Sequence, residues 1–459
     1  MTKKTRRVLF LGAVALFVLL SILVLIFAFG FRYDFSNNIL VKTGSIVLKP
    51  NSEAKIFINN KLEGGTSFLN NFFSKKSLLP GTYLVKVTKD KYFTWQKKIN
   101  VREGLISDFS HIVLFNQEQI EPTVINRTPP FSIDRISRNM VYLQKGTISL
   151  YNLNEDKQPI YEGGPTIWDP ATLKIIWGTD GKDVIAYDQT RATYFDLVNK
   201  TFYNLGTSKQ FSLTTATLND GRIYFLRSLS KAPLGTGRDL ISFSVEQSKS
   251  IIVSKNVVSF FTDKNEIFVL AKVDSLASEQ FIKTGLDGKN EEILGVVENF
   301  KQFQNARIRK IDNRNGAYFI LINSDLYSLK NGVWVLISKN VGDFAISPNN
   351  AGLGWYTGRE FWVEWLKDTE YQPLKKAGEK ELITRADQDI LSFSWYKNSS
   401  YIFIESLGSL VVSEVDLRGG INSYSILDLG TQGQAWYDLG QDKIFKLSNL
   451  NGLASVNIP

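Results

Sequence analysis

An apolar run near the beginning of the chain constrains the fold most. Val8 to Phe29 is a stretch of 22 residues without a charge, and Ser21 is the only residue in it with a polar side chain. As a helix rising about 1.5 Å per residue, it would reach roughly 33 Å, enough to cross the hydrocarbon core of a bilayer. Basic residues next to a membrane segment tend to stay in the cytoplasm. The flank 1–7 contains four of them: Lys3, Lys4, Arg6 and Arg7. We therefore predict a single-pass transmembrane helix over 8–29, with a cytoplasmic N-terminus and the bulk of the chain outside the cell membrane.

A cleaved signal peptide is the alternative interpretation of this run. Ala28 and Gly30 form a small-x-small pattern that a signal peptidase could accept. The apolar region of a signal peptide usually spans about 7–15 residues, and this run is longer. Its length favours an uncleaved anchor.

Composition indicates a folded chain held together by apolar cores. The 459 residues are enough for two or three domains. Aromatic residues make up 13% and only 12 residues are proline, which argues against disorder. There is no cysteine. Disulfides and thiolate metal sites are therefore excluded.

The net charge of +9 is concentrated near the N-terminal end. The flank 1–7 contributes +4, and residues 42–117 hold 12 Lys and Arg against 5 Asp and Glu, which gives +7. Residues 118–459 hold 37 against 39, which gives −2, while Arg32 and Asp34 cancel. A basic domain next to the membrane would attract anionic lipids or wall polymers. Nucleic acid fits this location poorly, and we expect no such partner.

The sequence of residues 42–117 predicts short strands separated by turns. Apolar or alternating segments recur at Thr43–Leu48, Lys55–Ile58, Tyr83–Val87, Phe93–Val101 and Ile106–Phe115. Several short strands at this spacing predict a small β-sandwich. The less regular segment between Gly65 and Ser77 is expected to be an edge loop or one helical turn.

This region resembles the PEGA domain family. The family pattern combines a Pro-x-Gly-Ala turn, an apolar strand, a Gly-containing hairpin, a Leu-x-Pro-Gly-x-Tyr turn and a Trp-containing segment before a closing strand. The matching positions are Gly44, Pro50, Ala54, Ile56, Ile58, Gly64, Gly65, Thr66, Leu79, Pro80, Gly81, Tyr83, Val85, Val87, Tyr92, Trp95, Val101, Gly104 and Leu114. The first motif departs from the pattern because three residues separate Pro50 from Ala54, and Lys91 replaces the usual Gly before Tyr92. The resemblance implies an envelope β-sandwich that mediates interactions, and it carries over no functional residue.

Lysines are abundant in the same region. They could form an ordinary solvated face, or a surface that faces a polyanion. The candidates for a polyanion-facing role are Lys86, Lys89, Lys91, Lys97 and Lys98.

Residues 118–459 contain short β segments in units of about 40 residues, with Gly, Asn and Asp at the turns. Such units predict a β-propeller, for which eight blades are favoured and seven remain an alternative. The last segment, Gln434 to Ile458, supplies only about three strands. We expect Pro122 to Arg127 to complete it, because closing the ring removes exposed sheet edges.

Few residues in the chain could support catalysis. His111 is the only histidine and lies before the propeller. A Ser-His-Asp or Cys-His apparatus and a His-based metal site are therefore excluded within residues 118–459. We expect no catalytic residue, no cofactor and no metal. The basic cluster Arg307, Arg309, Lys310 and Arg314 is interpreted as a solvated loop.

The densest aromatic stretch offers a candidate ligand-binding platform. Its tryptophans are Trp355, Trp362 and Trp365. Alternation along a strand places neighbouring side chains on opposite faces, so one set should pack between blades while the other could be exposed to a glycan or protein.

Together these features predict a mostly β, membrane-anchored, extracytoplasmic binding or scaffold protein of the bacterial cell envelope. The propeller would recognise a protein or a wall polymer. The alternative is an extracytoplasmic glycan-active enzyme that uses two propeller carboxylates.

Overall fold

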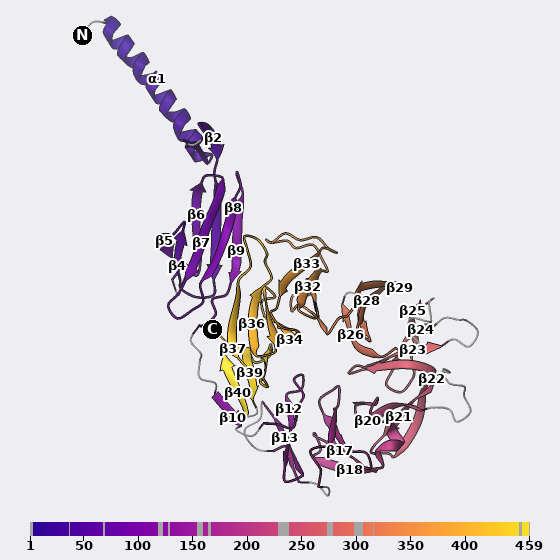
Figure 1. Cartoon of the computed structure of the whole chain (residues 1–459). Coiled ribbons are helices and arrows are strands. Elements are labelled where there is room, and N and C mark those ends of the chain that lie inside the picture. The colour runs from indigo at the N-terminus through magenta and orange to yellow at the C-terminus, as the bar shows by residue number, and fades with distance from the viewer. Residues whose placement is uncertain are drawn as a thin grey trace.

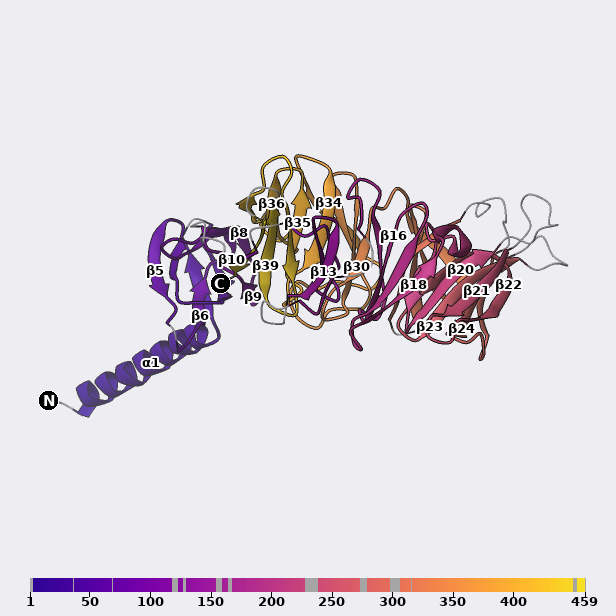
Figure 2. The same cartoon turned by 90° about the horizontal axis from the view of Figure 1, so that it is seen from below.

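The computed structural model describes residues 3–35, 37–67, 69–117, 123–126, 129–153, 159–163, 167–227, 238–272, 279–297, 306–314, 316–448 and 452–458. The described chain forms a helix with a hairpin, a small sandwich and a ring of sheets (Figure 1). Seen from below, the helix projects from one side of the sandwich and the ring lies on the other side (Figure 2).

Helix α1 (Lys3–Ala28) includes the predicted apolar run. Its segment Lys4–Ala28 is long and apolar enough to cross a membrane and is not buried by the rest of the chain. A helix of this kind fits either a membrane anchor or a signal sequence. A two-stranded hairpin, β1 (Phe31–Asp34) and β2 (Ile39–Lys42), follows it.

The sandwich is made of two sheets. The first has the order β6-β3-β9 and contains β3 (Gly44–Pro50), β6 (Phe73–Leu78) and β9 (Ile106–Ile112). The second has the order β5-β4-β7-β8 and contains β4 (Lys55–Ile58), β5 (Lys61–Gly65), β7 (Gly81–Thr88) and β8 (Trp95–Val101). Buried and exposed residues alternate strictly along β8, and the buried side chains of both sheets meet around Trp95. The predicted small β-sandwich is confirmed.

One local prediction in the sandwich was wrong. The segment expected to be an edge loop or helical turn ends in strand β6, which pairs antiparallel with β3. Strand β6 lies at the edge of its sheet, and its sequence, Phe-Ser-Lys-Lys-Ser-Leu, contains mostly polar residues. The burial alternation that marks a strand in sequence is therefore weak here.

The ring begins with two four-stranded sheets. They contain β11 (Ser132–Ile133), β12 (Asn139–Gln144), β13 (Thr147–Asn152) and β14 (Tyr161–Glu162), then β15 (Lys174–Trp177), β16 (Asp183–Tyr187), β17 (Ala192–Asp196) and β18 (Thr201–Gly206). A short 3-10 helix, η1 (Ser208–Phe211), follows.

A seven-stranded sheet comes next. It contains β19 (Thr217–Asn219), β20 (Arg222–Arg227), β21 (Arg238–Ser244), β22 (Lys249–Thr262), β23 (Glu266–Lys272), β24 (Glu279–Gly285) and β25 (Glu292–Val297). The first part of the long strand β22 pairs with β21, and its last part pairs with β23. Because β22 joins two groups of strands, the count of eight blades stays a prediction.

Three further four-stranded sheets complete the regular part. They contain β26 (Ile308–Arg314), β27 (Ala317–Ile322), β28 (Asp325–Lys330) and β29 (Val333–Ser338), then β30 (Phe344–Ile346), β31 (Gly352–Thr357), β32 (Glu360–Trp365) and β33 (Lys380–Arg385), and finally β34 (Ile390–Trp395), β35 (Tyr401–Ser406), β36 (Ser409–Glu414) and β37 (Ser423–Asp428). The sheets follow one another around a common centre, as in a β-propeller (Figure 1).

The last sheet takes strands from both ends of the propeller chain. Its order is β10-β40-β39-β38, with β10 (Thr123–Asn126), β38 (Gln434–Asp438), β39 (Lys443–Ser448) and β40 (Gly452–Asn457). Thr123 pairs with Ser455, and Val124 with Ala454. This confirms the predicted closing strand, although Pro122 and Arg127 lie outside the described residues.

Polar contacts join neighbouring sheets at equivalent positions. Asn139, the first residue of β12, donates a hydrogen bond of 2.8 Å to the carbonyl of Gly181 in the next sheet's first turn. Asp183, the first residue of β16, accepts a hydrogen bond of 2.9 Å from the backbone N–H of Gly221. The repeat is therefore visible in the contacts between sheets as well as in the strands.

Candidate functional site

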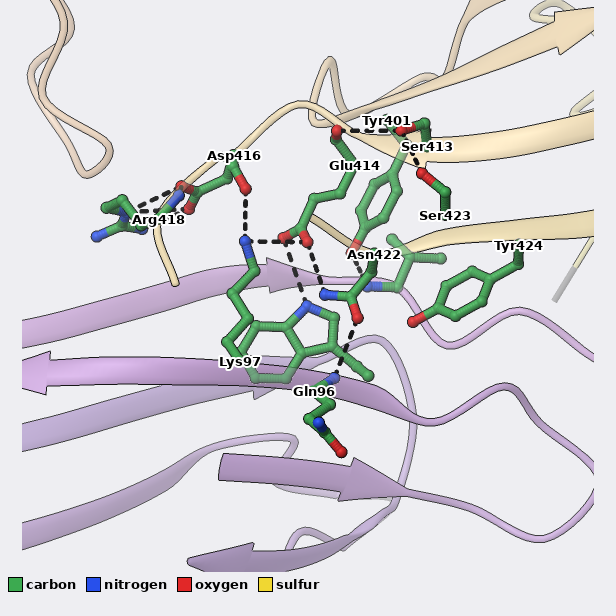
Figure 3. Close-up of polar contacts among 12 residues, drawn as sticks. Gln96, Lys97, Tyr401, Ser413, Glu414, Asp416, Arg418, Asn422, Ser423 and Tyr424 are labelled. Carbon is green, nitrogen blue, oxygen red and sulfur yellow. Dashed lines mark hydrogen bonds and ion pairs between the residues drawn. The ribbon is translucent and has the colours of Figure 1, made fainter. Parts of the chain in front are cut away.

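The most extensive polar site in the described chain is the joint between sandwich and propeller (Figure 3). The propeller segment 416–422, between β36 and β37, lies along the edge strand β8. The N–H of Lys98 donates to the carbonyl of Gly419 at 3.0 Å, and the N–H of Gln96 donates to Asn422 Oδ1 at 3.1 Å. Gly419 has φ +70°, and a Cβ there would lie 2.4 Å from the Lys98 carbonyl oxygen, so this contact requires glycine.

The neighbouring edge strand β9 is covered by two propeller side chains. Arg418 Nη2 donates to the carbonyl of Asp108 at 2.8 Å, and Gln372 Nε2 donates to the carbonyl of Ile106 at 2.7 Å. Gln372 Oε1 accepts the N–H of Asp108 at 3.1 Å and a hydrogen bond from Arg418. Both sandwich edges that face the propeller thus have backbone groups satisfied by it, which protects them from pairing with other chains.

A buried ion pair lies at the centre of the joint (Figure 3). Lys97 Nζ is 3.1 Å from Glu414 Oε2, and both side chains are almost fully buried. Trp95 Nε1 and Asn422 Nδ2 donate to the same carboxylate, at 3.4 and 2.9 Å. Burial raises the pKa of Glu414, and the Lys97 charge opposes the rise. Lys97 also donates to the carbonyl of Asp416.

Aromatic packing also joins the sandwich to the propeller. Phe115, which follows β9, packs edge to face against Tyr396, Tyr401 and Phe403 of the propeller. Phe93 stacks on Tyr424 with ring centroids 4.8 Å apart. The joint therefore combines buried apolar area with satisfied polar groups, as a rigid interface requires.

The predicted polyanion-facing role was wrong for Lys97. Its ammonium is buried under the propeller, where it compensates Glu414 and Asp416 and is inaccessible to a polymer. Lys86 bonds Asn60 at 2.9 Å, and the Lys89 ammonium lies 4.3 Å from the Tyr92 ring centre. Lys91 and Lys98 are exposed. For these four residues the role stays a prediction.

The predicted aromatic platform was wrong for Trp355 and Trp365, and for Trp362 it stays a prediction. Trp355 and Trp365 are buried, in two different apolar clusters between sheets. Trp362 is half-buried beside Trp355 and donates its N–H to Glu360 at 3.1 Å. The physical reason is that neighbouring sheets of the ring pack against the faces that carry Trp355 and Trp365.

His111 is exposed on β9 and lines a cavity of about 380 Å³ beside the joint. Asp368 and Asp416 line it too. Hydrogen bonds from Lys376 hold the pKa of Asp368 below its usual value. Burial alone would raise the pKa of Asp416, but Arg418 and Lys97 hold it lower. Neither carboxylate suits the proton-donating role that glycoside hydrolysis requires.

In the described chain, four carboxyl groups have a raised pKa, with burial as the main cause: Asp183, Glu279, Asp312 and Glu414. Asp312 is the least buried of them, with a side chain 24% exposed and Arg314 at 3.0 Å. Burial raises the pKa of Asp183 and of Glu279 to about 7 each. Asp183 is 1% exposed and Glu279 is 0% exposed. Within the described residues, no group of three or more His, Asp or Glu is placed to hold a metal ion.

A second cavity, of about 420 Å³, offers a better candidate ligand site on the propeller. It lies beside Thr217 of β19, Val258–Phe261 of β22 and Ile308 of β26. Ser259 Oγ accepts the N–H of Ile308 at 2.9 Å, which ties two of these strands together.

The described lining of this cavity has three cations and no carboxylate: Arg238, Arg307 and Arg309. Arg238 donates one bond to the Val258 carbonyl, and Arg309 donates to the carbonyls of Asn323 and Gly342. A guanidinium has five N–H donors, so each keeps capacity for a carboxylate or phosphate.

The sequence interpretation missed this site. It placed Arg307 and Arg309 in a solvated loop, whereas Arg307 directly precedes β26, Arg309 lies in it, and both line a cavity. Arg238 is distant in sequence, and only the ring brings the three together.

Neither a family model nor a curated protein sequence matches the chain, so membership of the PEGA family is not shown. Solved structures match its fold. The β-propeller domain of Cps50 (Swd1) from Myceliophteria thermophila is 8% identical, covers 73% of this chain and 97% of its own, and has a TM-score of 0.39. An oligogalacturonate lyase from Vibrio parahaemolyticus is 10% identical, with coverage of 74% and 92% and a TM-score of 0.34. A eukaryotic initiation factor is 9% identical, with coverage of 82% and 96% and a TM-score of 0.36. These likenesses concern the fold alone.

Proposed function

We propose that the chain is a membrane-anchored, extracytoplasmic binding protein of the bacterial cell envelope. Helix α1 is its single-pass anchor, and the N-terminus is cytoplasmic. The sandwich is a PEGA-like domain that holds the propeller, and the propeller recognises an envelope protein or wall polymer. The ordered turns of the sandwich sequence support the PEGA-like assignment.

The joint is the observation that carries this proposal. A propeller on a flexible linker could serve many roles, but this one is fixed to the sandwich through Lys97, Glu414 and the covered edges of β8 and β9. Such a joint suits a protein that presents a recognition surface at a set distance from a membrane. The arginine-lined cavity suggests that the partner carries an anionic group there, because guanidinium groups pair well with carboxylate and phosphate.

The test is photo-crosslinking in intact cells. A crosslinking amino acid at Arg307 should capture one envelope component, while the same group at Ile136, which is exposed elsewhere on the propeller, should not. Arg307→Glu should reduce capture from a nearby second crosslinking position at Thr215, and Lys339→Glu, with the same charge change, should not. Recovery of the whole chain as a cytoplasmic, membrane-free protein would contradict the proposal. Equal capture from Arg307 and Ile136 would contradict the assigned binding site.

Among the described residues, no observation favours the alternative of a glycan-active enzyme. Asp368 and Asp416, which line the cavity beside the joint, have lowered pKa values. Asp183, Glu279 and Glu414, whose pKa values are raised, are buried.

A further inference from the structure

The hairpin β1–β2 lies directly at the end of helix α1. Arg32 Nη1 donates to the Phe27 carbonyl at 3.3 Å, and its guanidinium lies 4.6 Å from the Phe27 ring centre. At the base of the hairpin, the N–H of Thr43 donates to the Gly30 carbonyl at 2.8 Å. The hairpin is therefore held against the helix end, on the side of the sandwich away from the propeller (Figures 1 and 2).

One face of the hairpin is aromatic and exposed. Tyr33 pairs with Leu40 and Phe31 pairs with Lys42, so these four side chains share a face. Phe35 extends that face, since its ring lies 5.0 Å from the Tyr33 ring in an edge arrangement. Tyr33 is 45% exposed, Phe35 84% and Leu40 50%.

Such a face requires a partner. An isolated two-stranded hairpin is at best marginally stable in water, and this one belongs to no larger sheet in the described chain. Covering its exposed aromatic and aliphatic groups would contribute favourable burial at about 25 cal/mol per Å².

The chemistry and the position select a lipid surface as that partner. Aromatic side chains are favoured at the membrane–water boundary, where their rings sit at the level of the headgroups. The hairpin strands carry Arg32 and Lys42 against Asp34, a net positive charge that would attract anionic lipids. The face also continues from the end of the helix that is long enough to cross the bilayer.

We propose that the hairpin lies in the headgroup layer, with the face formed by Phe31, Tyr33, Phe35 and Leu40 against lipid. This inference rests on the proposed function, because it requires α1 to cross the membrane. Two attachments, the helix and the hairpin, would then fix the rotation of the protein about the helix axis.

The absence of cysteine makes a direct test simple. Single cysteines replace Phe17 in the helix, Phe35 or Leu40 in the hairpin, and Ile136 in the propeller, each in the full-length chain. Each is labelled with an environment-sensitive fluorophore, and the protein is placed in bilayers containing phosphatidylglycerol and nitroxide-bearing phosphatidylcholine. We expect blue-shifted emission and loss of most of the intensity at positions 17, 35 and 40. Position 136, exposed at 84%, should show neither change.

The outcomes separate the inference from the proposed function. If position 17 is quenched while positions 35 and 40 emit as in water, the anchor stands and the hairpin inference is overturned. If positions 35 and 40 are blue-shifted but unquenched, the face contacts protein, such as a second copy, and the inference is overturned. If position 17 is unquenched, the anchor itself is contradicted.

Discussion

At the scale of single residues, Lys97 shows how a charge can be structural. It lies in the alternating series Trp95, Lys97, Ile99 and Val101, all buried on one face of β8. We predicted a polyanion-facing role for Lys97, although its place in the alternation is that of the apolar residues Trp95, Ile99 and Val101. What the sequence could not supply was Glu414, more than three hundred residues away, which makes burial of the ammonium tolerable.

We predict that Lys97→Ala destabilises the protein by about 3–5 kcal/mol, because it leaves the Glu414 carboxylate buried without its partner. Chemical denaturation of the purified full-length protein in detergent measures the change. Lys98→Ala, at an exposed position on the same strand, should change stability by less than about 0.5 kcal/mol. Equal effects from the two variants would contradict a structural ion pair.

Asp183 should make stability depend on pH. Burial raises its pKa from 3.8 to about 7 in the folded chain, so folding favours the protonated form. Its contribution to stability is complete below about pH 4 and is lost as the pH rises through 7. Asp183→Asn, which keeps an oxygen for the Gly221 N–H, should match the wild type near pH 4 and be more stable by roughly 1–4 kcal/mol at pH 8.

The control for this prediction has the opposite sign. Burial of Asp188 is outweighed by hydrogen bonds from Arg191 and Thr190, which hold its pKa at about 2. Asp188→Asn should therefore lose stability at neutral pH and change little below pH 2. Thermal unfolding at a series of pH values measures both variants. If the stability difference between the wild type and Asp183→Asn is the same at pH 4 and at pH 8, the raised pKa of Asp183 is refuted.

At the scale of elements, the closing sheet depends on more than strand pairing. Arg138, in the turn before β12, forms a two-bond contact with Asp438 at the end of β38, at 2.7 and 2.8 Å. Asp438 is nearly buried, and the contact raises the pKa of Arg138. It joins the first sheet after β10 to the sheet that closes the ring.

We predict that Arg138→Ala lowers stability by roughly 2–4 kcal/mol, because a nearly buried carboxylate loses its charged partner. Lys397→Ala removes a more exposed ion pair with Asp442 nearby and should cost less than about 1 kcal/mol. Hydrogen exchange of the backbone amides in β10 and β40 would show whether the lost stability comes from opening of the sheet that closes the ring. Unchanged exchange there, with faster exchange elsewhere, would contradict that role.

The elements also show where sequence reasoning succeeds and where it stops. The strand between Pro122 and Arg127 was predicted because a ring needs its edges closed, and β10 is found there. Alternation correctly indicated two faces for β32, but it could not show which of them is buried: Trp365 lies on the buried face and Trp362 on the half-buried one. The arginine-lined cavity needs Arg238 and Arg309 on different sheets, which only the assembled ring provides.

At the scale of the whole molecule, the joint predicts a rigid arm. Spin labels on cysteines at Leu62 of the sandwich and Ile136 of the propeller should give one narrow distance distribution in pulsed electron resonance, as should a pair within the propeller at Ile136 and Leu391. Lys97→Ala should broaden the first distribution and leave the second unchanged. A broad first distribution in the wild type would contradict the rigid joint.

The closing sheet has a consequence for how the protein is made. Its paired strands β10 and β40 are separated in sequence by almost the entire propeller, so the ring cannot close before the residues of β40 have been synthesised. Until then the backbone groups of β10 that pair with β40 have no partner strand. A variant truncated before Gly452 would leave that edge unpaired, and an unpaired strand edge exposes a chain to aggregation.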